Sequence, residues 1–332
     1  LARDSLDIAF WFPERRQIYG SEYSDEVKFG VCQVTIPRLH TPGELESPSL
    51  LLRFEVKHDP EKHIVLAKTQ PLPATDFYDQ LQKEMGRSGK NLLVFIHGYN
   101  VSFEDAARRT AQMAVDLKFP GAPVFYSWPS YSNWYRYPDD AENIQASVGQ
   151  IRTFLEELAN KAGADSINLV AHSMGNVGLT QALADLQTSK PLFNQVVLAA
   201  PDIDAKVFRE QIAPRITTKA RRVTLYTSQT DLALLASRYF NSGDRIGDSS
   251  RGIVTIPGID TIDATSVDSS LLGHSYYGSN VNVLDDIANL LRDLPVGERQ
   301  YLELQAESKP PYWSFAPQYR KASLQGRDPA TR

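Results

Sequence analysis

Short apolar runs alternate with amphipathic stretches along most of the chain from residue 91 onward. The apolar runs are typical of parallel strands buried on both faces, and the stretches between them carry apolar residues at helical spacing. The predicted strands are 91–96, 123–128, 167–171, 195–200, 222–227 and 252–256, and the predicted helices are 103–117, 140–161, 176–186, 206–212, 232–239 and 283–291. This alternation predicts an α/β fold with a mostly parallel, doubly wound sheet.

The N-terminal part of the chain has a different pattern. Residues 1–26 look irregular, and three strand-like runs separated by Pro and Gly follow at 27–36, 50–56 and 64–67. We therefore expect residues 1–88 to form an N-terminal extension whose antiparallel strands join the central sheet. Residues 89–295 are expected to form the main catalytic core, and residues 296–332 an extended C-terminal tail along the surface.

One junction between a predicted strand and a predicted helix carries a serine. The run ending at Ala171 is followed by His172-Ser173-Met174-Gly175, and a helical pattern begins directly afterwards. A serine in such a tight turn is pushed out above the sheet, and the next backbone N–H lies at a helix start, which favours an oxyanion. The layout predicts a nucleophile elbow, although Ala171 replaces the first Gly of the G-x-S-x-G consensus. A serine that caps the helix is the alternative interpretation.

Composition and charge narrow the classes of function. The chain has 332 residues, of which 42% are hydrophobic and 23% charged, which suits one large globular unit with or without a subdomain. A net charge of −5 provides no basic excess for nucleic acid. No apolar run approaches the roughly 20 residues needed to span a bilayer. Cys32 is the only cysteine, which excludes an intramolecular disulfide and a zinc–thiolate cluster.

A serine nucleophile needs a base and an acid that orients the base. In a doubly wound sheet these groups come from loops at the carboxyl ends of other strands. Asp231 lies four residues after the run that ends at Thr227, and His274 follows the last predicted strand. The resulting order of Ser173, Asp231 and His274 is the order of the α/β-hydrolase fold.

Each partner of the serine has an alternative. Asp202 and Asp204 follow the preceding predicted strand, where some proteins of this fold place the acid. Asp231 is also in position to cap the next helix, and His274 could be a surface histidine. The other five histidines are in poorer positions for a base, because they lie in the N-terminal extension, next to the serine or directly after the predicted strand 91–96.

The segment after the predicted strand 91–96 reads His97-Gly98-Tyr99-Asn100 and suits an oxyanion-hole loop. We expect the backbone N–H of Tyr99 or Asn100 to complete the hole together with that of Met174. Candidate substrate-binding residues lie beside this loop and in the aromatic segment after the next predicted strand: His97, His172, Trp128, Tyr131 and Trp134. Packing of these aromatic residues against the C-terminal tail is the alternative to an acyl pocket.

Several motifs together resemble a known group. The sequence resembles the α/β-hydrolase superfamily and, within it, the esterase/lipase-like family of unknown function DUF900, over about residues 29–289. The motifs that carry the resemblance are FGVCQVTIP at 29–37 followed by His40, FIHGYN at 95–100, YSWP at 126–129, LVAHSMGN at 169–176, APDID at 200–204 and YTSQTDLAL at 226–234. Each motif is weak by itself, and the set is specific.

The resemblance implies hydrolysis of carboxylic esters by Ser173 as nucleophile, His274 as base and Asp231 as acid. It implies no metal and no organic cofactor, and it favours a periplasmic or exported location over a cytoplasmic one. The short gap between Pro201 and Arg221 holds little more than one helix, so we expect an α/β-hydrolase fold without a large cap domain.

The sequence thus predicts a serine esterase for small-molecule esters with short or medium acyl groups. We expect no nucleic acid among the partners and no membrane-spanning segment in the chain, and the oligomeric state is left open. The alternatives are an acyltransferase or amidase with the same triad, and a non-catalytic hydrolase-like binding protein. An inert scaffold differs from an enzyme in having no activated serine that reacts with a fluorophosphonate.

Overall fold

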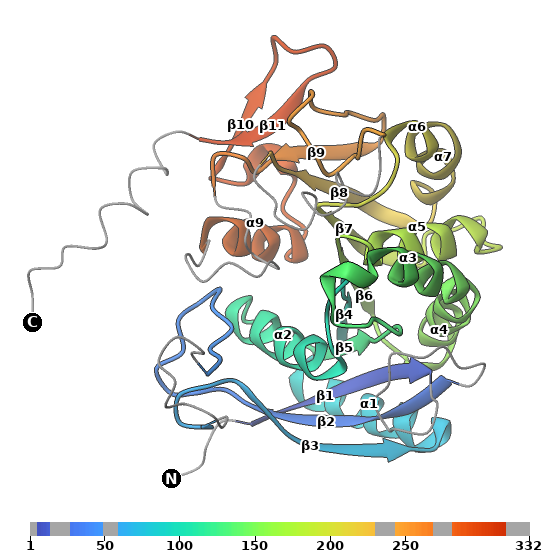
Figure 1. Cartoon of the computed structure of the whole chain (residues 1–332), viewed down its shortest axis with the longest axis vertical. Coiled ribbons are helices and arrows are strands. Elements are labelled where there is room, and N and C mark those ends of the chain that lie inside the picture. Colours follow the sequence, from blue (N-terminus) through green and yellow to red (C-terminus); the bar gives the residue numbers. More distant parts are fainter. Residues whose placement is uncertain (1–4, 14–26, 49–58, 230–242, 268–280, 317–332) are drawn as a thin grey trace, which may run out of the picture.

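The computed structural model describes residues 5–13, 27–48, 59–229, 243–267 and 281–316. Within these residues a single sheet of 11 strands runs through the molecule, in the order β10-β11-β9-β8-β7-β6-β4-β5-β1-β2-β3. Helices cover both faces of its middle part (Figure 1). The predicted α/β class is confirmed, with a mostly parallel sheet and additional antiparallel strands from the N-terminal part.

The parallel centre of the sheet contains the strands that position the serine. It consists of β4 (Asn91–Ile96), β5 (Ala122–Tyr126), β6 (Ser166–His172), β7 (Phe193–Ala199), β8 (Ala220–Thr227) and β9 (Ile259–Asp263), each parallel to its neighbours. These strands are almost entirely buried, as their continuous apolar runs predict. Their carboxyl ends meet at one edge of the sheet, which is where ligands bind in folds of this kind.

The last predicted strand is wrong by several residues. The sequence indicated a strand at 252–256, whereas β9 begins at Ile259. Pro257 has no N–H for a ladder, and Gly258 has a φ of +81°, so the chain turns there, with the Ile259 N–H donating to the Ile256 carbonyl at 3.1 Å. The strand starts only after this turn.

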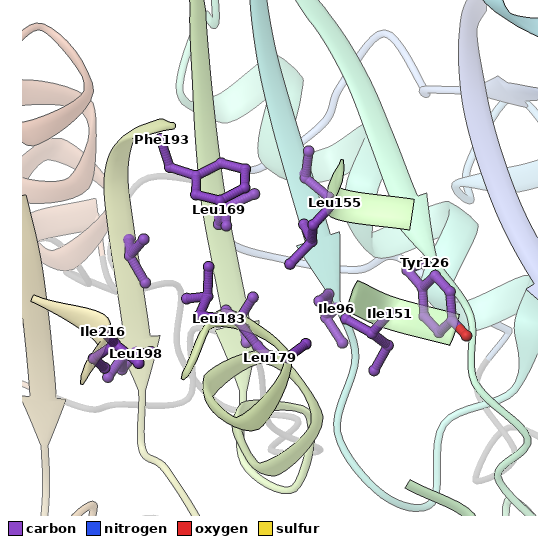
Figure 2. Packing of buried hydrophobic residues seen from close by; sticks show 14 of the residues in the cluster. Ile96, Tyr126, Ile151, Leu155, Leu169, Leu179, Leu183, Phe193, Leu198 and Ile216 are labelled. Carbon is purple, nitrogen blue, oxygen red and sulfur yellow. The ribbon is translucent and has the colours of Figure 1, made fainter. Parts of the chain in front are cut away.

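The helices divide between the two faces of the sheet. On one face, α1 (Ala74–Ser88), α4 (Val148–Lys161) and α5 (Gly175–Asp185) pack into a large apolar cluster. Figure 2 shows part of it, with Ile151, Leu155, Leu179 and Leu183 next to side chains of the central strands. On the other face lie α2 (Phe103–Asp116) and α9 (Val281–Leu291), which pack into a second cluster.

The long helix predicted at 140–161 is bent in the structure. It consists of α3 (Tyr137–Ala146) and α4, which meet at Ser147. The Ser147 hydroxyl donates to the Asn143 carbonyl at 2.8 Å, and this kind of back-bonding bends helices. α3 lies at the carboxyl edge of the sheet, where Asp140 contacts the loops after β4 and β5.

Residues 200–219, all of them described, contain no large insertion. They form α6 (Ala205–Val207), a π-helical turn (Phe208–Ile212) and α7 (Ala213–Ile216). The fold therefore has no large cap domain between β7 and β8.

The N-terminal part contributes three strands. They are β1 (Ser5–Pro13), β2 (Val27–Thr35) and β3 (Val65–Leu72). The runs at 27–36 and 64–67 are confirmed as strands, and the run at 50–56 lies outside the described residues. The interpretation of 1–26 as irregular is wrong for 5–13, because β1 pairs in parallel with β5 and antiparallel with β2. That pairing with distant strands, rather than a local alternation, supplies its hydrogen bonds.

The C-terminal segment adds strands at the opposite edge. After a 3₁₀ turn (Val296–Glu298), β10 (Leu302–Gln305) and β11 (Tyr312–Phe315) form an antiparallel pair, and β11 runs parallel to β9. The segment expected as an extended tail is thus part of the sheet over these residues. In the described part of the chain, no helix is long and apolar enough to cross a membrane.

Candidate active site

Ser173 lies in the turn between β6 and α5, as the sequence predicts. Its φ is +49°, a region that residues other than glycine rarely adopt. The side chain is buried, and its hydroxyl has no hydrogen-bond partner in the described part of the chain. A strained, buried serine with an uncommitted hydroxyl at a strand-to-helix turn has the geometry of a nucleophile elbow.

The loop after β4 lies directly against this turn. A side chain at Gly175 would place its Cβ 2.3 Å from the His97 carbonyl oxygen, and one at Gly98 would place it 3.1 Å from the Cβ of Ser173. Only glycine permits the first approach, and the second leaves little room. The absence of side chains at both positions therefore brings the His97-Gly98-Tyr99-Asn100 loop to the serine.

Asn176 supports the strained turn from within the first turn of α5. Its Nδ2 donates to the Ser173 carbonyl at 3.0 Å and to the Ala199 carbonyl at 3.1 Å. The Ser173 N–H donates to the same Ala199 carbonyl at 3.0 Å, so the turn is attached to the end of β7. Asn176 was given no role from the sequence, where it appears only as the last residue of the 169–176 motif.

The side chain of His97 points into the protein interior and not toward solvent. It is fully buried and stacks on Trp128, with 5.0 Å between the ring centroids. Its Nδ1 donates to the Gly98 carbonyl at 2.8 Å, so Nε2 accepts from the Ser127 hydroxyl at 3.2 Å. Burial lowers the pKa of His97 to about 4, against the opposing effect of its backbone hydrogen bonds. The imidazole is therefore neutral and fixes the loop.

Trp128 also holds the loop that contains His97. Its Nε1 donates to the His97 carbonyl at 2.7 Å, and the side chain is only 2% exposed. Tyr131 is half-buried, with the Arg136 guanidinium 3.8 Å above its ring. Trp134 begins a 3₁₀ turn (Trp134–Arg136), and its side chain is outside the described part. His172 is buried beside Gly98, with Nδ1 3.1 Å from where a Cβ on that glycine would lie.

Asn100, one of the two candidate donors in the loop after β4, is held by a carboxylate of α3. The Asn100 N–H donates to Oδ2 of the buried Asp140 at 3.2 Å. Asn100 itself has a φ of +57°, so the chain reverses there. The Met174 N–H precedes α5, and no hydrogen bond from it is found within the described residues. Asp140, on α3, was also not singled out from the sequence.

Of the three predicted triad residues, Ser173 alone belongs to the described part of the chain. Asp231 and His274 both lie outside it, so their approach to Ser173 stays a prediction. The alternative acids are described. Asp202 accepts from the Tyr137 hydroxyl at 2.6 Å and faces the Arg245 Nε at 3.3 Å, with its side chain fully buried. Asp204 caps the short α6 by accepting from the Lys206 and Val207 N–H groups.

No metal site emerges from the described residues, since no three His, Cys, Asp or Glu side chains gather there in a way that could hold an ion. A hollow of about 490 Å³ lies between α1 and the N-terminal strands, lined among others by Leu72, Phe77 and Ala122. Ala122 is at the amino end of β5, so this hollow is at the opposite end of the strands from Ser173. A substrate in this hollow would be out of reach of the serine hydroxyl.

Comparison with known families and structures adds to this geometry. The family model described as "Alpha/beta hydrolase of unknown function (DUF900)" matches residues 74–293, which include the elbow and the loops around it. A search of curated proteins finds no match.

Among solved structures, the similar ones include a protein of Xanthomonas campestris pv. campestris assigned to the alpha/beta hydrolase superfamily. It has 12% identity and a TM-score of 0.34, covering 62% of this chain and 99% of that one. A structure from a study of two fungal esterases of Rhizomucor miehei has 13% identity and a TM-score of 0.36, covering 85% and 83%. The acylaminoacyl peptidase of Pyrococcus horikoshii has 12% identity and a TM-score of 0.34, covering 84% and 41%. The family assignment rests on the family model.

Proposed function

The chain belongs to the DUF900 family of alpha/beta hydrolases, and we propose that it is a serine hydrolase that cleaves carboxylic esters with short or medium acyl groups. The observation that carries the proposal is the strained, buried Ser173 with its uncommitted hydroxyl. A serine that only capped the helix would accept from an N–H of the first turn, and α5 has no such side-chain cap. Helix capping therefore does not explain the strained backbone of Ser173, and strain of this kind is most frequent at functional sites.

In the proposed reaction, His274 takes the hydroxyl proton of Ser173 while Oγ attacks the ester carbonyl carbon. Asp231 orients the ring and stabilises the imidazolium that forms. His274 then gives the proton to the leaving alcohol as the C–O bond breaks, which leaves an acyl group on Ser173. A water molecule, deprotonated by the same histidine, then attacks the acyl carbon. The bond to Ser173 Oγ breaks, the histidine returns its proton to Oγ, and the acid is released. These steps require no cofactor.

The oxyanion of the tetrahedral intermediate is assigned to the backbone N–H groups of Met174 and Tyr99. The support for this pair is that Gly98 lies against the serine, so that the amide of the next residue, Tyr99, is close to the elbow. The Asn100 N–H, one residue further along, donates to Asp140. Removal of one donor from such a hole typically costs about 10²–10³ in kcat.

The test is the hydrolysis of p-nitrophenyl esters by Ser173→Ala. We expect kcat/KM to fall by about 10⁴-fold or more while the circular dichroism spectrum and Tm stay close to those of the wild type. Thr110→Ala is the matched control, because Thr110 is equally buried but its hydroxyl donates within α2, to the Ala106 carbonyl. Ester hydrolysis that survives Ser173→Ala at the wild-type rate contradicts the proposal.

The assignment of the acid is tested separately. Asp231→Asn is expected to lower kcat by about 10²–10⁴-fold, and His274→Ala by at least as much. Asp202→Asn, by comparison, is expected to act mainly on stability, because Asp202 is occupied by Tyr137 and Arg245. A larger loss of kcat for Asp202→Asn than for Asp231→Asn would move the acid to the end of β7.

A further inference from the structure

We propose that Asp140 is a positioning residue that fixes the oxyanion loop, residues 97–101, in the geometry required for catalysis. This inference rests on the proposed function and names a group that acts on the same site without touching the substrate. Asp140 belongs to α3, whereas the loop that it holds follows β4, so the two are 40 residues apart in the sequence at their contact.

The Asp140 carboxylate connects two loops at the carboxyl edge of the sheet. Its Oδ2 accepts from the Asn100 N–H at 3.2 Å and from the Ser130 hydroxyl at 2.7 Å. Its Oδ1 accepts from the Tyr131 N–H at 2.9 Å. The Ser130 oxygen in turn accepts from the Val101 N–H at 3.3 Å, which adds a second, indirect contact to the oxyanion loop.

These contacts fix the peptide that follows the proposed donor. The Tyr99 N–H belongs to the residue directly before Asn100, so holding the Asn100 amide and the Val101 amide fixes the direction of the chain at both positions. Asn100 is in the left-handed region, which an asparagine tolerates at some cost in energy. A loop in such a conformation needs outside contacts to keep it, and Asp140 supplies them.

The energetic cost of Asp140 also indicates a role beyond packing. The carboxyl group is completely buried, and burial raises its pKa although three donors oppose the shift. A buried carboxylate is expensive to desolvate, and an apolar residue of similar volume would often be as stable or more stable. Its hydrogen bonds run to the oxyanion loop and to the loop after β5, not to the sheet interior or to another helix.

The neighbouring residues of α3 provide matched controls. Asn143, one turn further along the helix, donates to the Pro129 carbonyl at 3.1 Å. This bond ties α3 to the loop after β5, which also contains Ser130 and Tyr131, without contacting the oxyanion loop. Asp139 is exposed and paired with Arg136 at 2.6 Å. Substitutions at these positions perturb the same helix but leave the Asn100 amide bound.

The experiment compares Asp140→Ala, Asp140→Asn and Ser130→Ala with Asn143→Ala and Asp139→Ala in ester hydrolysis. We expect kcat to fall by about 30-fold in Asp140→Ala and by about 5-fold in Ser130→Ala, with KM changed by less than about 3-fold. In Asp140→Asn the amide must set an N–H against one of the donors, so an intermediate loss is expected. Both control variants keep the wild-type kcat.

A transition-state analogue separates positioning from structural damage. The affinity for n-butylboronic acid, which forms a tetrahedral adduct on the serine, is expected to fall by the same factor as kcat. Amide hydrogen exchange within 97–101 is expected to accelerate in the Asp140 variants and not in the controls. If Asp140→Ala does not fold, the kcat, the boronate affinity and the exchange rates of Ser130→Ala and Asp140→Asn test the proposal in its place.

Two results overturn the inference. In the first, Asp140→Asn and Ser130→Ala keep the wild-type kcat, boronate affinity and exchange rates. In the second, Asn143→Ala loses as much kcat as they do, which would attribute the loss to damage of α3. A wild-type protein without ester hydrolysis or boronate binding would instead contradict the proposed function, and hydrogen exchange would still show whether Asp140 holds the loop.

Discussion

Two buried aspartates on opposite faces of the sheet show how differently the two sides of this molecule use charge. Asp140, on α3, accepts from three donors that belong to the oxyanion loop and to the loop after β5. Asp286, on α9, accepts from the Tyr226 hydroxyl at 2.6 Å and from Arg299 at 3.3 Å. Burial raises the pKa of both carboxyl groups.

The surroundings of the two carboxylates indicate different roles. Asp286 lies between α9 and the sheet, and Arg299 leads into the β10–β11 pair, so their ion pair attaches the C-terminal strands to the core. Within the described residues, Oδ1 of Asp286 and two nitrogens of Arg299 have no hydrogen-bond partner. The α9 side therefore contains an incompletely satisfied structural pair, while both oxygens of Asp140 are satisfied by loops of the candidate site. The comparison predicts that the charge of Asp140 acts on catalysis and that of Asp286 on stability.

The largest effect is expected at the elbow, on the α3 side. Asn176→Ala removes two hydrogen bonds that hold Ser173 at positive φ, and we expect kcat to fall by about 10²-fold because the hydroxyl is misplaced. Steady-state kinetics measure this loss. Asn168→Ala is the matched control, since Asn168 also donates to a backbone carbonyl, that of Leu92, but at the amino end of β6. Equal losses of kcat in both variants would contradict the comparison.

The next effect is expected in stability on the α9 side. Asp286→Asn leaves the buried Arg299 without its ion-pair partner, so the free energy of unfolding is expected to fall by about 3 kcal/mol, with kcat of the folded protein unchanged. Urea denaturation measures the fall. The neighbouring Asp285→Asn alters only a half-buried contact to the Tyr301 hydroxyl at 3.3 Å and is expected to cost less than about 1 kcal/mol. A loss of kcat in Asp286→Asn would remove the distinction between the two sides.

A third buried charge sharpens the comparison because its pH dependence is measurable. His40 is held between Glu46 at 2.8 Å and Asp116 at 2.7 Å. Burial by itself would lower the pKa of His40, but the hydrogen bonds and charges of the two carboxylates outweigh burial and raise the pKa to about 9. The protonated ring thus stabilises the fold fully below the unfolded pKa of about 6.5, and this contribution is lost as the pH rises through about 9.

Thermal unfolding between pH 6 and pH 10 tests this third site. The wild type is expected to lose up to about 2 kcal/mol over this range, after allowance for solvent screening. His40→Gln cannot be protonated and is expected to be less stable at pH 6 and to show a flatter profile. A variant with the same slope as the wild type would show that the His40 cluster does not carry the pH dependence.

The smallest effect is expected at the contact between α3 and the loop after β7. Tyr137→Phe removes the hydrogen bond to Asp202, whose carboxylate keeps its ion pair with Arg245. We expect a loss of about 1 kcal/mol in the free energy of unfolding and less than a 3-fold change in kcat. The exposed Tyr135→Phe serves as control and is expected to match the wild type. A kcat loss for Tyr137→Phe as large as that for Asp140→Ala would assign the positioning role to the whole helix.

The sequence was informative where a local pattern determines the structure. The apolar run of β4 and the elbow after β6 could be located because burial on both faces leaves a continuous apolar signature. The strand β1 was missed because its partners, β2 and β5, lie far away in the chain. The helix bend at Ser147 depends on one hydroxyl that the apolar periodicity does not reveal.

The residues of the candidate site also differ in whether a local pattern reveals them. Ser173 and the His97 loop follow from a turn motif and from their place after strands. Asp140 and Asn176 were missed because an acidic residue and an asparagine in the first turns of helices are ordinary there. Their roles depend on contacts with Asn100 and Ala199, which only the folded chain brings close.

The most direct test of an activated Ser173 is to label the purified protein with a fluorophosphonate and locate the adduct by peptide mass spectrometry. An activated serine attacks the phosphorus and expels fluoride, so we expect one stoichiometric adduct on Ser173 and none in Ser173→Ala. No adduct on Ser173, or an adduct on another residue that persists unchanged in Ser173→Ala, would contradict this role for the elbow.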